Sequence, residues 1–328
     1  MNKNLFIFTE AGEDIGFGHI MRCQALSAQF ENNGTDVTIY LYTKGDINLQ
    51  ESKIKVANWL QASFFEKDGA FFNDSTALVD SYLAEASVYK KIKSVFSKVI
   101  VIDDYNRIVY PNSDILINPG IWGNKLDYSN QTARIEVGSQ FIILRNDFIK
   151  YRNQYTVRKD IKSIGITLGG NDFRKLIPVL TKQIANDNAF ENILVFSGSE
   201  AYKNELTKTI SHNNIEFFGY LDADTMAQKL LSCDVVVSAA GQTINELAFL
   251  GIPTIAIGVD HDQKFNLQGF HKNGFINNEL QWDQPDLLKM TQAILESMQD
   301  AETRLKTHAI GQKIVDGNGT ENIVRLFS

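Results

Sequence analysis

Short apolar runs alternate with helix-like repeats along the whole chain. Runs rich in Val, Ile, Leu and Phe predict buried strands, and apolar positions that recur every three to four residues predict helices. In the first half the predicted strands cover residues 5–9, 37–42, 77–79, 99–102, 115–117 and 141–144, and the helices cover 19–32 and 89–96. In the second half the strands cover 163–167, 192–196, 215–217, 235–238 and 254–257, and the helices cover 173–186, 223–232, 243–250, 264–272, 285–298 and 319–327.

This alternation predicts two doubly wound, Rossmann-like domains of the α/β class. Near-continuous apolar strands separated by helices are typical of parallel sheets that are covered on both faces. The alternation restarts at Ser163 after a polar stretch, residues 151–160, which is the predicted linker. We therefore expect an N-terminal domain over residues 1–155 and a C-terminal domain over 156–328, facing each other across a cleft. The last predicted helix is long enough to pack back on the first domain.

Composition and charge narrow the class of partner. With 328 residues, the chain is long enough for two domains of ordinary size. Its formal net charge of −7 argues against a nucleic-acid or anionic-membrane binder, because both need a basic surface. No apolar run approaches the roughly 20 residues of a membrane span, and the residues before the first strand are too few for a signal peptide. Two cysteines, Cys23 and Cys233, are too few for a disulfide framework. These features favour a cytoplasmic protein.

A glycine-rich loop joins the first predicted strand to the first helix. It reads Glu10-Ala-Gly-Glu-Asp-Ile-Gly-Phe-Gly-His19, in which Gly16 and Gly18 allow the backbone to approach a ligand closely. The helix beyond it offers unpaired N–H groups, which favour an anion. His19 stands at the start of that helix, where it either serves as a general base or merely caps and packs. Arg22, one turn later, either pairs with an acidic neighbour or a phosphate or lies on the surface.

Polar residues follow three other strands of the first domain. The segments are Val79-Asp80-Ser81-Tyr82, Ile102-Asp103-Asp104-Tyr105 and Ile117-Asn118-Pro119-Gly120. Because the carboxyl ends of parallel strands meet at one edge of a sheet, together they would surround the same edge as His19. Each segment alone is also an ordinary way to begin a turn.

The second domain contains two more glycine-containing turns. In Ile166-Thr-Leu-Gly-Gly-Asn-Asp172 the double glycine either approaches a phosphate or forms a plain tight turn. In Ser238-Ala-Ala-Gly-Gln-Thr-Ile-Asn-Glu246 the small residues leave room for a ligand. The Glu246 carboxylate either accepts hydrogen bonds from a ribose diol or is a glutamate favoured by the helix dipole.

Neither a metal nor a cofactor is expected. The histidines and cysteines lack the spacing of metal ligands. The first glycine loop lacks the third glycine of a dinucleotide fingerprint, and no Gly-x-Ser-x-Gly nucleophile turn is present. The net charge still allows a small anionic ligand, because local groups bind such a molecule, and the sequence indicates no particular protein partner.

Taken in order, these segments resemble a known family. Ile15-Gly-Phe-Gly-His-Ile-Met-Arg-Cys23 is similar to the amino-terminal motif of the nucleotide-sugar hydrolases of pseudaminic acid synthesis, and of related spore-coat polysaccharide proteins. The hydrolases remove UDP from UDP-2,4-diacetamido-2,4,6-trideoxy-β-L-altropyranose. Further segments follow in the family's order over nearly the whole chain: Asp80-Ser-Tyr82, Asp103-Asp-Tyr105, Leu144-Arg145-Asn-Asp-Phe148, Gly169-Gly-Asn-Asp172 and Ser238-Ala-Ala-Gly241. The last of these is shared with many GT-B transferases.

The resemblance implies a GT-B-like fold and metal-independent hydrolysis of a UDP-sugar at its anomeric carbon, with inversion. His19 would be the base that activates water. Sugar contacts would come from Gly16, Gly18, Arg22, Asp80, Tyr82, Asp104, Tyr105, Arg145 and Gln263. Nucleotide contacts would come from Gly169, Gly170, Asn171, Phe218, Leu221, Ala240, Gly241, Gln242, Thr243 and Glu246, with the backbone around Phe218 and Leu221 meeting the uracil.

The chain also departs from the family pattern. Phe8 and Glu10 stand where family hydrolases usually carry an Arg-x-Asp pair, Asp262-Gln263 replaces an Asn-Gln pair, and Gln242 replaces a serine. Two other hypotheses stay open beside the hydrolase. One is a GT-B glycosyltransferase for a surface polysaccharide, in which an acceptor hydroxyl takes the place of water. The other is a binding or scaffolding protein with a degenerate site.

Overall fold

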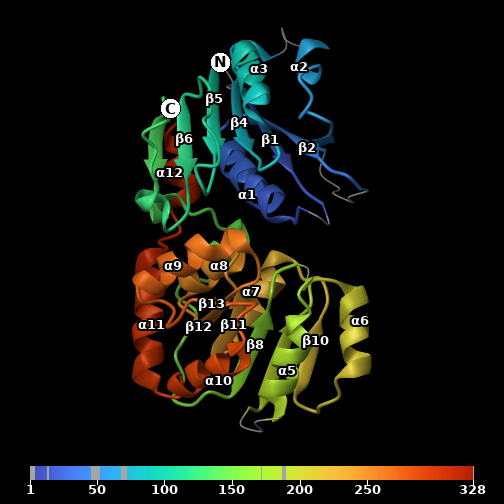
Figure 1. Cartoon of the computed structure of the whole chain (residues 1–328), viewed down its shortest axis with the longest axis vertical. Coiled ribbons are helices and arrows are strands. Elements are labelled where there is room, and N and C mark those ends of the chain that lie inside the picture. Colours follow the sequence, from blue (N-terminus) through green and yellow to red (C-terminus); the bar gives the residue numbers. More distant parts are fainter. Residues whose placement is uncertain are drawn as a thin grey trace. The chain divides into compact units, whose positions relative to one another are not determined.

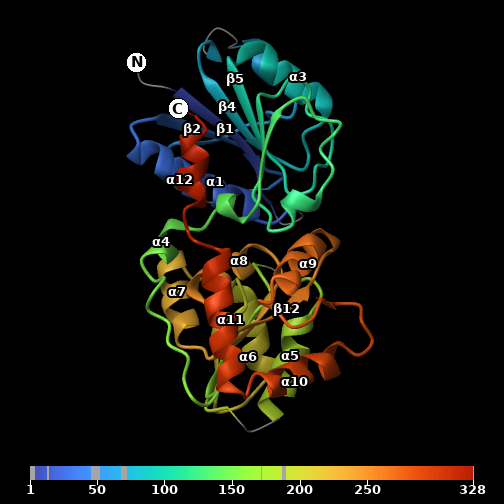
Figure 2. The same cartoon turned by 90° about the vertical axis from the view of Figure 1, so that its left-hand side faces the viewer.

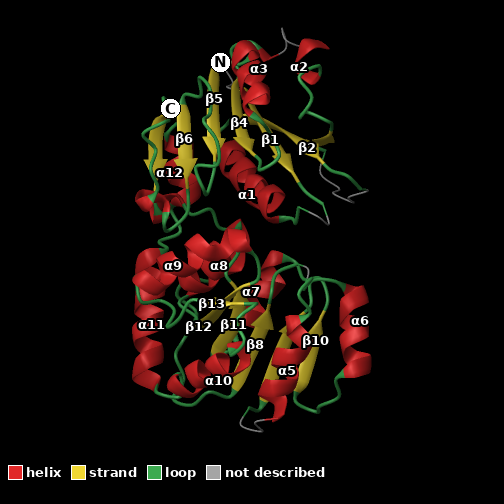
Figure 3. Ribbon diagram, viewed as in Figure 1, coloured by secondary structure: helices red, strands yellow, loops and turns green. Residues whose placement is uncertain are grey.

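The computed structural model describes residues 4–12, 15–45, 52–67, 72–170, 172–186 and 190–327. The chain divides into two compact units (Figure 1). The first comprises Met1–Ile143 together with Asn318–Ser328, and the second comprises Leu144–Gly317. Figure 3 shows that each unit combines a sheet with helices on its faces. The predicted class, two α/β units with parallel sheets, is therefore confirmed.

In its described part, the first unit contains a seven-stranded sheet of order β3-β2-β1-β4-β5-β6-β7, with every pairing parallel. The strands are β1 (Asn4–Glu10), β2 (Asp36–Tyr42), β3 (Ile54–Val56), β4 (Thr76–Asp80), β5 (Lys98–Ile102), β6 (Ile115–Asn118) and β7 (Arg134–Val137). The α-helices are α1 (Gly18–Asn32), α2 (Phe64–Lys67), α3 (Ala86–Val95) and α12 (Gly319–Arg325). Helix α12 lies beside α1, which Figure 2 shows.

Apolar side chains cover both faces of this sheet, and β1 illustrates how. Leu5 and Ile7 pack into a cluster with residues of α1 and α12. The alternate residues Phe6 and Phe8 pack into a second cluster with residues of α2 and α3, including the buried Phe65. Because successive side chains of a strand point to opposite faces, a strand buried on both faces must be apolar throughout. This explains the unbroken apolar run at residues 5–8.

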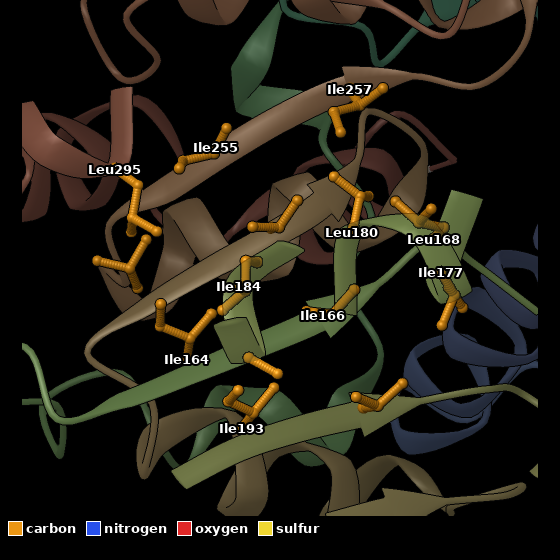
Figure 4. Close-up of a cluster of buried hydrophobic side chains, with 14 of the residues drawn as sticks. Ile164, Ile166, Leu168, Ile177, Leu180, Ile184, Ile193, Ile255, Ile257 and Leu295 are labelled. Carbon is orange, nitrogen blue, oxygen red and sulfur yellow. The ribbon is translucent and has the colours of Figure 1, made fainter. Parts of the chain in front are cut away.

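In the second unit, the described residues form a six-stranded parallel sheet of order β10-β9-β8-β11-β12-β13. The strands are β8 (Ser163–Thr167), β9 (Asn192–Phe196), β10 (Ile215–Phe218), β11 (Val235–Ala239), β12 (Thr254–Gly258) and β13 (Leu280–Gln281). The α-helices are α4 (Asn146–Ile149), α5 (Leu176–Asn186), α6 (Glu200–Thr209), α7 (Ala223–Leu231), α8 (Gln242–Leu250), α9 (Lys264–Lys272), α10 (Leu287–Ser297) and α11 (Ala301–Ile314). Figure 4 shows Ile164 and Ile166 of β8 in the core with Ile177, Leu180 and Ile184 of α5.

The longest helices among the described residues are α1 and α11. Helix α1 has 15 residues and α11 has 14. Among the helices in the described ranges, none combines the length and the apolar character that a membrane crossing requires.

The predicted strand at 141–144 is wrong. Phe141 ends a 3₁₀ turn, Ser139–Phe141, and the edge strand of the sheet is instead β7. The run is apolar because it is buried as a connection: the first residue of α12, Gly319, packs directly against the backbone of Ile142. The other predicted strands and helices are present. The pattern did not predict β3, β7, β13, α2, α4, α6 and α11.

The two units also differ from the division predicted at residues 155 and 156. Residues 144–155 belong to the second unit, where the Tyr151 hydroxyl donates to Asp224 at 2.8 Å. Arg152 donates to the carbonyl oxygens of Gln312 and Val315. The stretch 151–160 is therefore packed on the second unit instead of forming a free linker. At the other end, residues 318–328 belong to the first unit.

We expect Gly319→Ala to destabilise the first unit. A Cβ at position 319 would overlap the carbonyl oxygen of Ile142 and lie 2.6 Å from its carbonyl carbon, so backbone must move. Overpacking of this kind costs about 1–3 kcal/mol in the free energy of unfolding, measurable by urea denaturation. Gly45→Ala is the matched control, because a Cβ at Gly45 meets no atom within 4 Å. Equal stability of the two variants would contradict this account of how α12 docks.

Candidate functional site

His19 and Asp80 form a buried pair at the carboxyl edge of the first sheet. His19 lies in the first turn of α1, and Asp80 is the last residue of β4, which neighbours β1 in the sheet. The Nδ1 atom of His19 lies 2.8 Å from Oδ1 of Asp80. The side chain of Asp80 is completely buried, and that of His19 is 8% exposed. The sequence had predicted that residues 80–82 lie at the same sheet edge as His19, and the structure confirms this.

Arg22 holds the Asp80 carboxylate from its other side. Its Nε donates to Oδ2 of Asp80 at 2.5 Å, and a terminal nitrogen donates to Oδ1 at 2.5 Å. Its other terminal nitrogen donates to both carboxylate oxygens of Asp104, at 2.9 and 3.1 Å. Arg22 therefore pairs with acidic neighbours, as one of the alternatives from the sequence predicted, and these neighbours are Asp80 and Asp104.

The charges around Asp80 determine which nitrogen of His19 carries a proton. Burial would raise the pKa of the Asp80 carboxyl, but the Arg22 guanidinium and His19 outweigh burial and hold this pKa well below its ordinary value. An ionised carboxylate can only accept hydrogen bonds, so Nδ1 of His19 must be the donor. In a neutral imidazole, Nε2 then keeps its lone pair and can accept a proton.

Tyr82 connects this pair to Asp104. Its hydroxyl donates to Oδ2 of Asp104 at 2.7 Å, and its ring meets the imidazole of His19 edge to face, with 4.3 Å between centroids. Burial and the Asp104 carboxylate raise the pKa of the Tyr82 hydroxyl well above its ordinary value, so the hydroxyl stays protonated. The ring of Tyr105 lies 5.2 Å from that of Tyr82. The predicted residues Asp104 and Tyr105 thus gather with His19.

Glu10 is a site residue whose role the sequence did not reveal. It ends β1, is completely buried, and accepts hydrogen bonds from the Ser81 hydroxyl and, at 2.7 Å, from the backbone N–H of Tyr82. These bonds fix the turn that follows β4 and therefore the direction of Tyr82. Where the sequence showed only a departure from an Arg-x-Asp pair, the carboxylate is used to build the site.

The first glycine loop leaves its backbone open. Gly16 has φ +81°, a conformation that favours glycine, and a Cβ at Gly16 or Gly18 would meet no atom within 4 Å. The loop closes on itself, because the N–H of Gly16 donates to the carbonyl of Gly12 at 2.7 Å. The other face of α1 packs on the core, where Ile20, Cys23, Leu26 and Phe30 are all buried.

Carboxyl-edge turns of the second sheet carry most of the residues predicted to meet a nucleotide. Gly169 follows β8 with φ +91°, and a Cβ at Gly169 or Gly170 would meet no atom within 4 Å. Gly198, after β9, packs so closely on this turn that a Cβ there would lie 2.8 Å from the carbonyl carbon of Gly170. Asn171, also predicted, lies outside the described residues.

The turn between β11 and α8 brings together more of the predicted residues. Ala240 follows β11, and its carbonyl accepts a hydrogen bond from Asn266 at 2.9 Å. Gly241 precedes α8, which begins at Gln242 and Thr243, both partly exposed. The side-chain nitrogen of Gln263 lies 3.6 Å from where a Cβ of Gly241 would be. Gln263, predicted to meet the sugar, therefore lies beside the turn predicted to meet the nucleotide.

Arg145 and Glu246 form an ion pair that the sequence did not predict. Nε and a terminal nitrogen of Arg145 donate to the two carboxylate oxygens of Glu246, at 2.6 and 2.7 Å. The side chain of Glu246 is 1% exposed and that of Arg145 is 20% exposed. Arg145 had been assigned to the first domain and Glu246 to the second, but both lie in the second unit.

The segment predicted to meet the uracil follows β10. Phe218 stacks on Phe196 of the neighbouring strand, with 5.3 Å between ring centroids, and is partly buried, as is Leu221. Between them, Tyr220 is 71% exposed. An exposed aromatic ring beside these residues is a further candidate contact, which the apolar pattern alone did not distinguish from the core.

Comparison with known proteins shows the type of fold. Residues 164–318 match the family model of the glycosyltransferase family 28 C-terminal domain. The crystal structure of MurG from Acinetobacter baumannii aligns over 99% of both chains with a TM-score of 0.67 and 13% identity. UDP-GlcNAc 2-epimerase from Neisseria meningitidis, solved bound to UDP-GlcNAc, aligns over 99% of both chains with a TM-score of 0.62 and 10% identity. At these identities the likeness shows the fold, which is GT-B-like.

Relatives found by sequence indicate a narrower group than the fold does. The chain is 26% identical to the spore coat polysaccharide biosynthesis protein SpsG of Bacillus subtilis, over 98% of this chain and 96% of that protein. It is 24% identical to a UDP-2,4-diacetamido-2,4,6-trideoxy-β-L-altropyranose hydrolase of Campylobacter jejuni, over 81% of this chain and 96% of the relative. The resemblance drawn from the motifs is therefore confirmed.

Two further relatives are about twice as long as the matched region. A Helicobacter pylori protein, named as a pseudaminic acid cytidylyltransferase and the same hydrolase, is 23% identical over 95% of this chain and 53% of its own length. An uncharacterised protein of Methanocaldococcus jannaschii is 26% identical over 76% of this chain and 54% of its own length. The chain thus spans about half the length of these two relatives.

Proposed function

We propose that this protein hydrolyses a UDP-activated sugar at the anomeric carbon, without a metal, and releases UDP and the free sugar. The observation that carries the proposal is the His19–Asp80 pair, in which a buried, ionised carboxylate leaves Nε2 of a histidine able to take a proton. The names of the Campylobacter and Helicobacter relatives support the reaction type and the UDP-sugar substrate. The product would serve the synthesis of a pseudaminic-type acid or a surface glycan.

In the proposed reaction, Nε2 of His19 removes a proton from water as the water oxygen attacks C1 of the sugar. The bond between C1 and the phosphate oxygen breaks, and its electron pair leaves with UDP, so that C1 is inverted. Asp80 keeps the imidazole in the required tautomer and stabilises the imidazolium that forms, as a carboxylate partner does in other histidine bases. Arg22, Asp104, Tyr82 and Tyr105 would contact the sugar or hold the groups that do.

The second unit would bind the leaving group. Two features support a phosphate site: a Cβ at Gly169 or Gly170 would meet no atom within 4 Å, and Gly241 directly precedes the start of α8, where backbone N–H groups attract anions. Glu246 would meet the ribose. Its carboxylate already accepts from Arg145, but each oxygen has a second lone pair to offer.

A GT-B glycosyltransferase is the second candidate. The match of residues 164–318 to the glycosyltransferase family 28 C-terminal domain favours it, since the same nucleotide site and the same base would serve an acceptor hydroxyl in place of water. The two functions differ in whether UDP is released when no acceptor is present.

The test is a coupled assay of UDP release from UDP-2,4-diacetamido-2,4,6-trideoxy-β-L-altropyranose, with a chelator present and no acceptor. The proposal predicts multiple turnovers per enzyme molecule. No release, in a protein that still binds UDP in a parallel titration, would favour the transferase or another sugar.

A further inference from the structure

Arg174 lies at the carboxyl edge of the second sheet, in the turn between the Gly169–Gly170 segment and α5. Its Nε donates to the carbonyl of Val259, the residue after β12, at 3.1 Å. Its guanidinium carbon lies 4.3 Å from the ring centroid of Trp282 and 4.7 Å from that of Phe173. Trp282 is itself anchored, because its backbone N–H donates to Gly258 at 3.0 Å. One hydrogen bond and contacts with two aromatic rings therefore orient this exposed guanidinium.

The terminal nitrogens of this guanidinium have no partner among the described residues. In the part of the chain that the structure describes, the Nε bond is the only hydrogen bond of Arg174, and no carboxylate oxygen lies within 4 Å of it. The two terminal groups carry four N–H donors, in a geometry that fits the oxygens of a phosphate. Holding a long side chain in place beforehand also reduces the entropy lost when a ligand binds.

Short contacts connect Arg174 to the other glycine turn. The N–H of Val259 donates to Oε1 of Gln263 at 3.2 Å, and the side-chain nitrogen of Gln263 approaches Gly241. Two other cations of this unit already have partners: Arg145 is paired with Glu246, and Lys175 lies over the ring of Tyr202 and 3.7 Å from a carboxylate oxygen of Glu205.

We propose that Arg174 binds the diphosphate of the nucleotide through its terminal nitrogens. This inference rests on the proposed function and adds a residue to it. When the bond from C1 to the phosphate oxygen breaks, negative charge accumulates on the diphosphate, and a guanidinium fixed beside it stabilises that charge without reorganising. The apolar and glycine motifs of the sequence do not indicate this residue, because its partners Val259 and Trp282 are 85 and 108 positions away.

The experiment measures binding of three probes, namely UDP, uridine and inorganic pyrophosphate, by titration calorimetry. We expect Arg174→Gln to lower the affinity for UDP and for pyrophosphate by about 10- to 100-fold, the range for loss of hydrogen bonds to a charged group. Uridine, which lacks phosphate, should bind as in the wild type. The affinities of Arg174→Lys should lie between those of the wild type and of Arg174→Gln, because lysine keeps the charge but lacks the planar donors. Lys175→Gln is the matched control and should bind all three probes with wild-type affinity.

Three results would overturn the inference. They are unchanged UDP and pyrophosphate binding in Arg174→Gln, a parallel loss of uridine binding, or a wild type that binds no pyrophosphate. The proposed function fails separately: if pyrophosphate binding depends on Arg174 but the wild type neither binds nor turns over a UDP-sugar, the anion site stands and the nucleotide assignment is wrong.

Discussion

Removal of the His19 imidazole should lower the rate of UDP release by about 10²–10⁴-fold, the usual contribution of a positioned general base. His19→Asn is the sharpest variant, because its amide can still donate to Asp80 but cannot accept a proton at the Nε2 position. The loss should appear in kcat more than in KM, since the base acts on the transition state. Single-turnover kinetics on the UDP-sugar measure it.

His271→Ala is the control for this experiment. His271 is exposed and also lies against a carboxylate, 3.1 Å from Glu279, but it stands in the last turn of α9, whereas the candidate residue Gln263 precedes the start of that helix. The control should turn over at the wild-type rate. If His19→Asn kept more than about a tenth of the wild-type kcat, well above the usual range for losing a base, His19 would not be the base.

Asp80→Asn should have the second-largest effect, on both rate and stability. The amide introduced by this substitution would no longer oblige Nδ1 of His19 to be the donor, so the imidazole loses its single tautomer, and we expect kcat to fall about 10²-fold or more. Arg22 would keep only Asp104 as an anionic partner, and weakening a buried ion pair should reduce the free energy of unfolding by about 1–3 kcal/mol. Urea denaturation measures the second effect.

Asp104→Asn separates these two roles. Asp104 shares Arg22 with Asp80 but makes no hydrogen bond to His19 within the described structure. Both variants should lower stability, whereas only Asp80→Asn should move the ¹⁵N chemical shifts of His19, which report its tautomer. Unchanged ¹⁵N shifts in Asp80→Asn would show that the carboxylate does not position the base.

The position of the site in the first unit could be predicted because strand order and chemistry coincide there. Asp80 and Asp104 follow apolar runs that can only be buried parallel strands, and such strands present their carboxyl ends to one edge. The sequence left the state of Arg22 open, since a helix residue one turn from the start can face solvent or a neighbour. Only the sheet order, with β4 beside β1 and β5 beside β4, brings two carboxylates to it.

Contacts between distant segments could not be predicted in this way. The pair of Arg145 and Glu246 joins positions 101 apart, and nothing in either segment specifies the other. In the sequence, Glu10 was only a departure from a family motif. Its buried hydrogen bonds to Ser81 and Tyr82 could not be predicted, because they depend on the register of β1 with β4.

Two of the four helices that the pattern did not predict, α6 and α11, have buried faces with too few apolar residues. The buried residues of α11 are Arg304, Thr307 and Gly311, so a repeat exists but it is polar or small. Gly311 is required there, because a Cβ would lie 2.7 Å from the carbonyl oxygen of Ala248 in α8. In α6 only Leu206 is buried. Neither pattern contains the apolar repeat from which a helix is predicted.

The most direct test of the central claim is turnover of the UDP-sugar in H₂¹⁸O without acceptor, followed by mass spectrometry of both products. Attack of water at C1 predicts one ¹⁸O atom in the free sugar and none in UDP. Label in UDP would mean that the phosphate–oxygen bond breaks instead, and would contradict hydrolysis at the anomeric carbon.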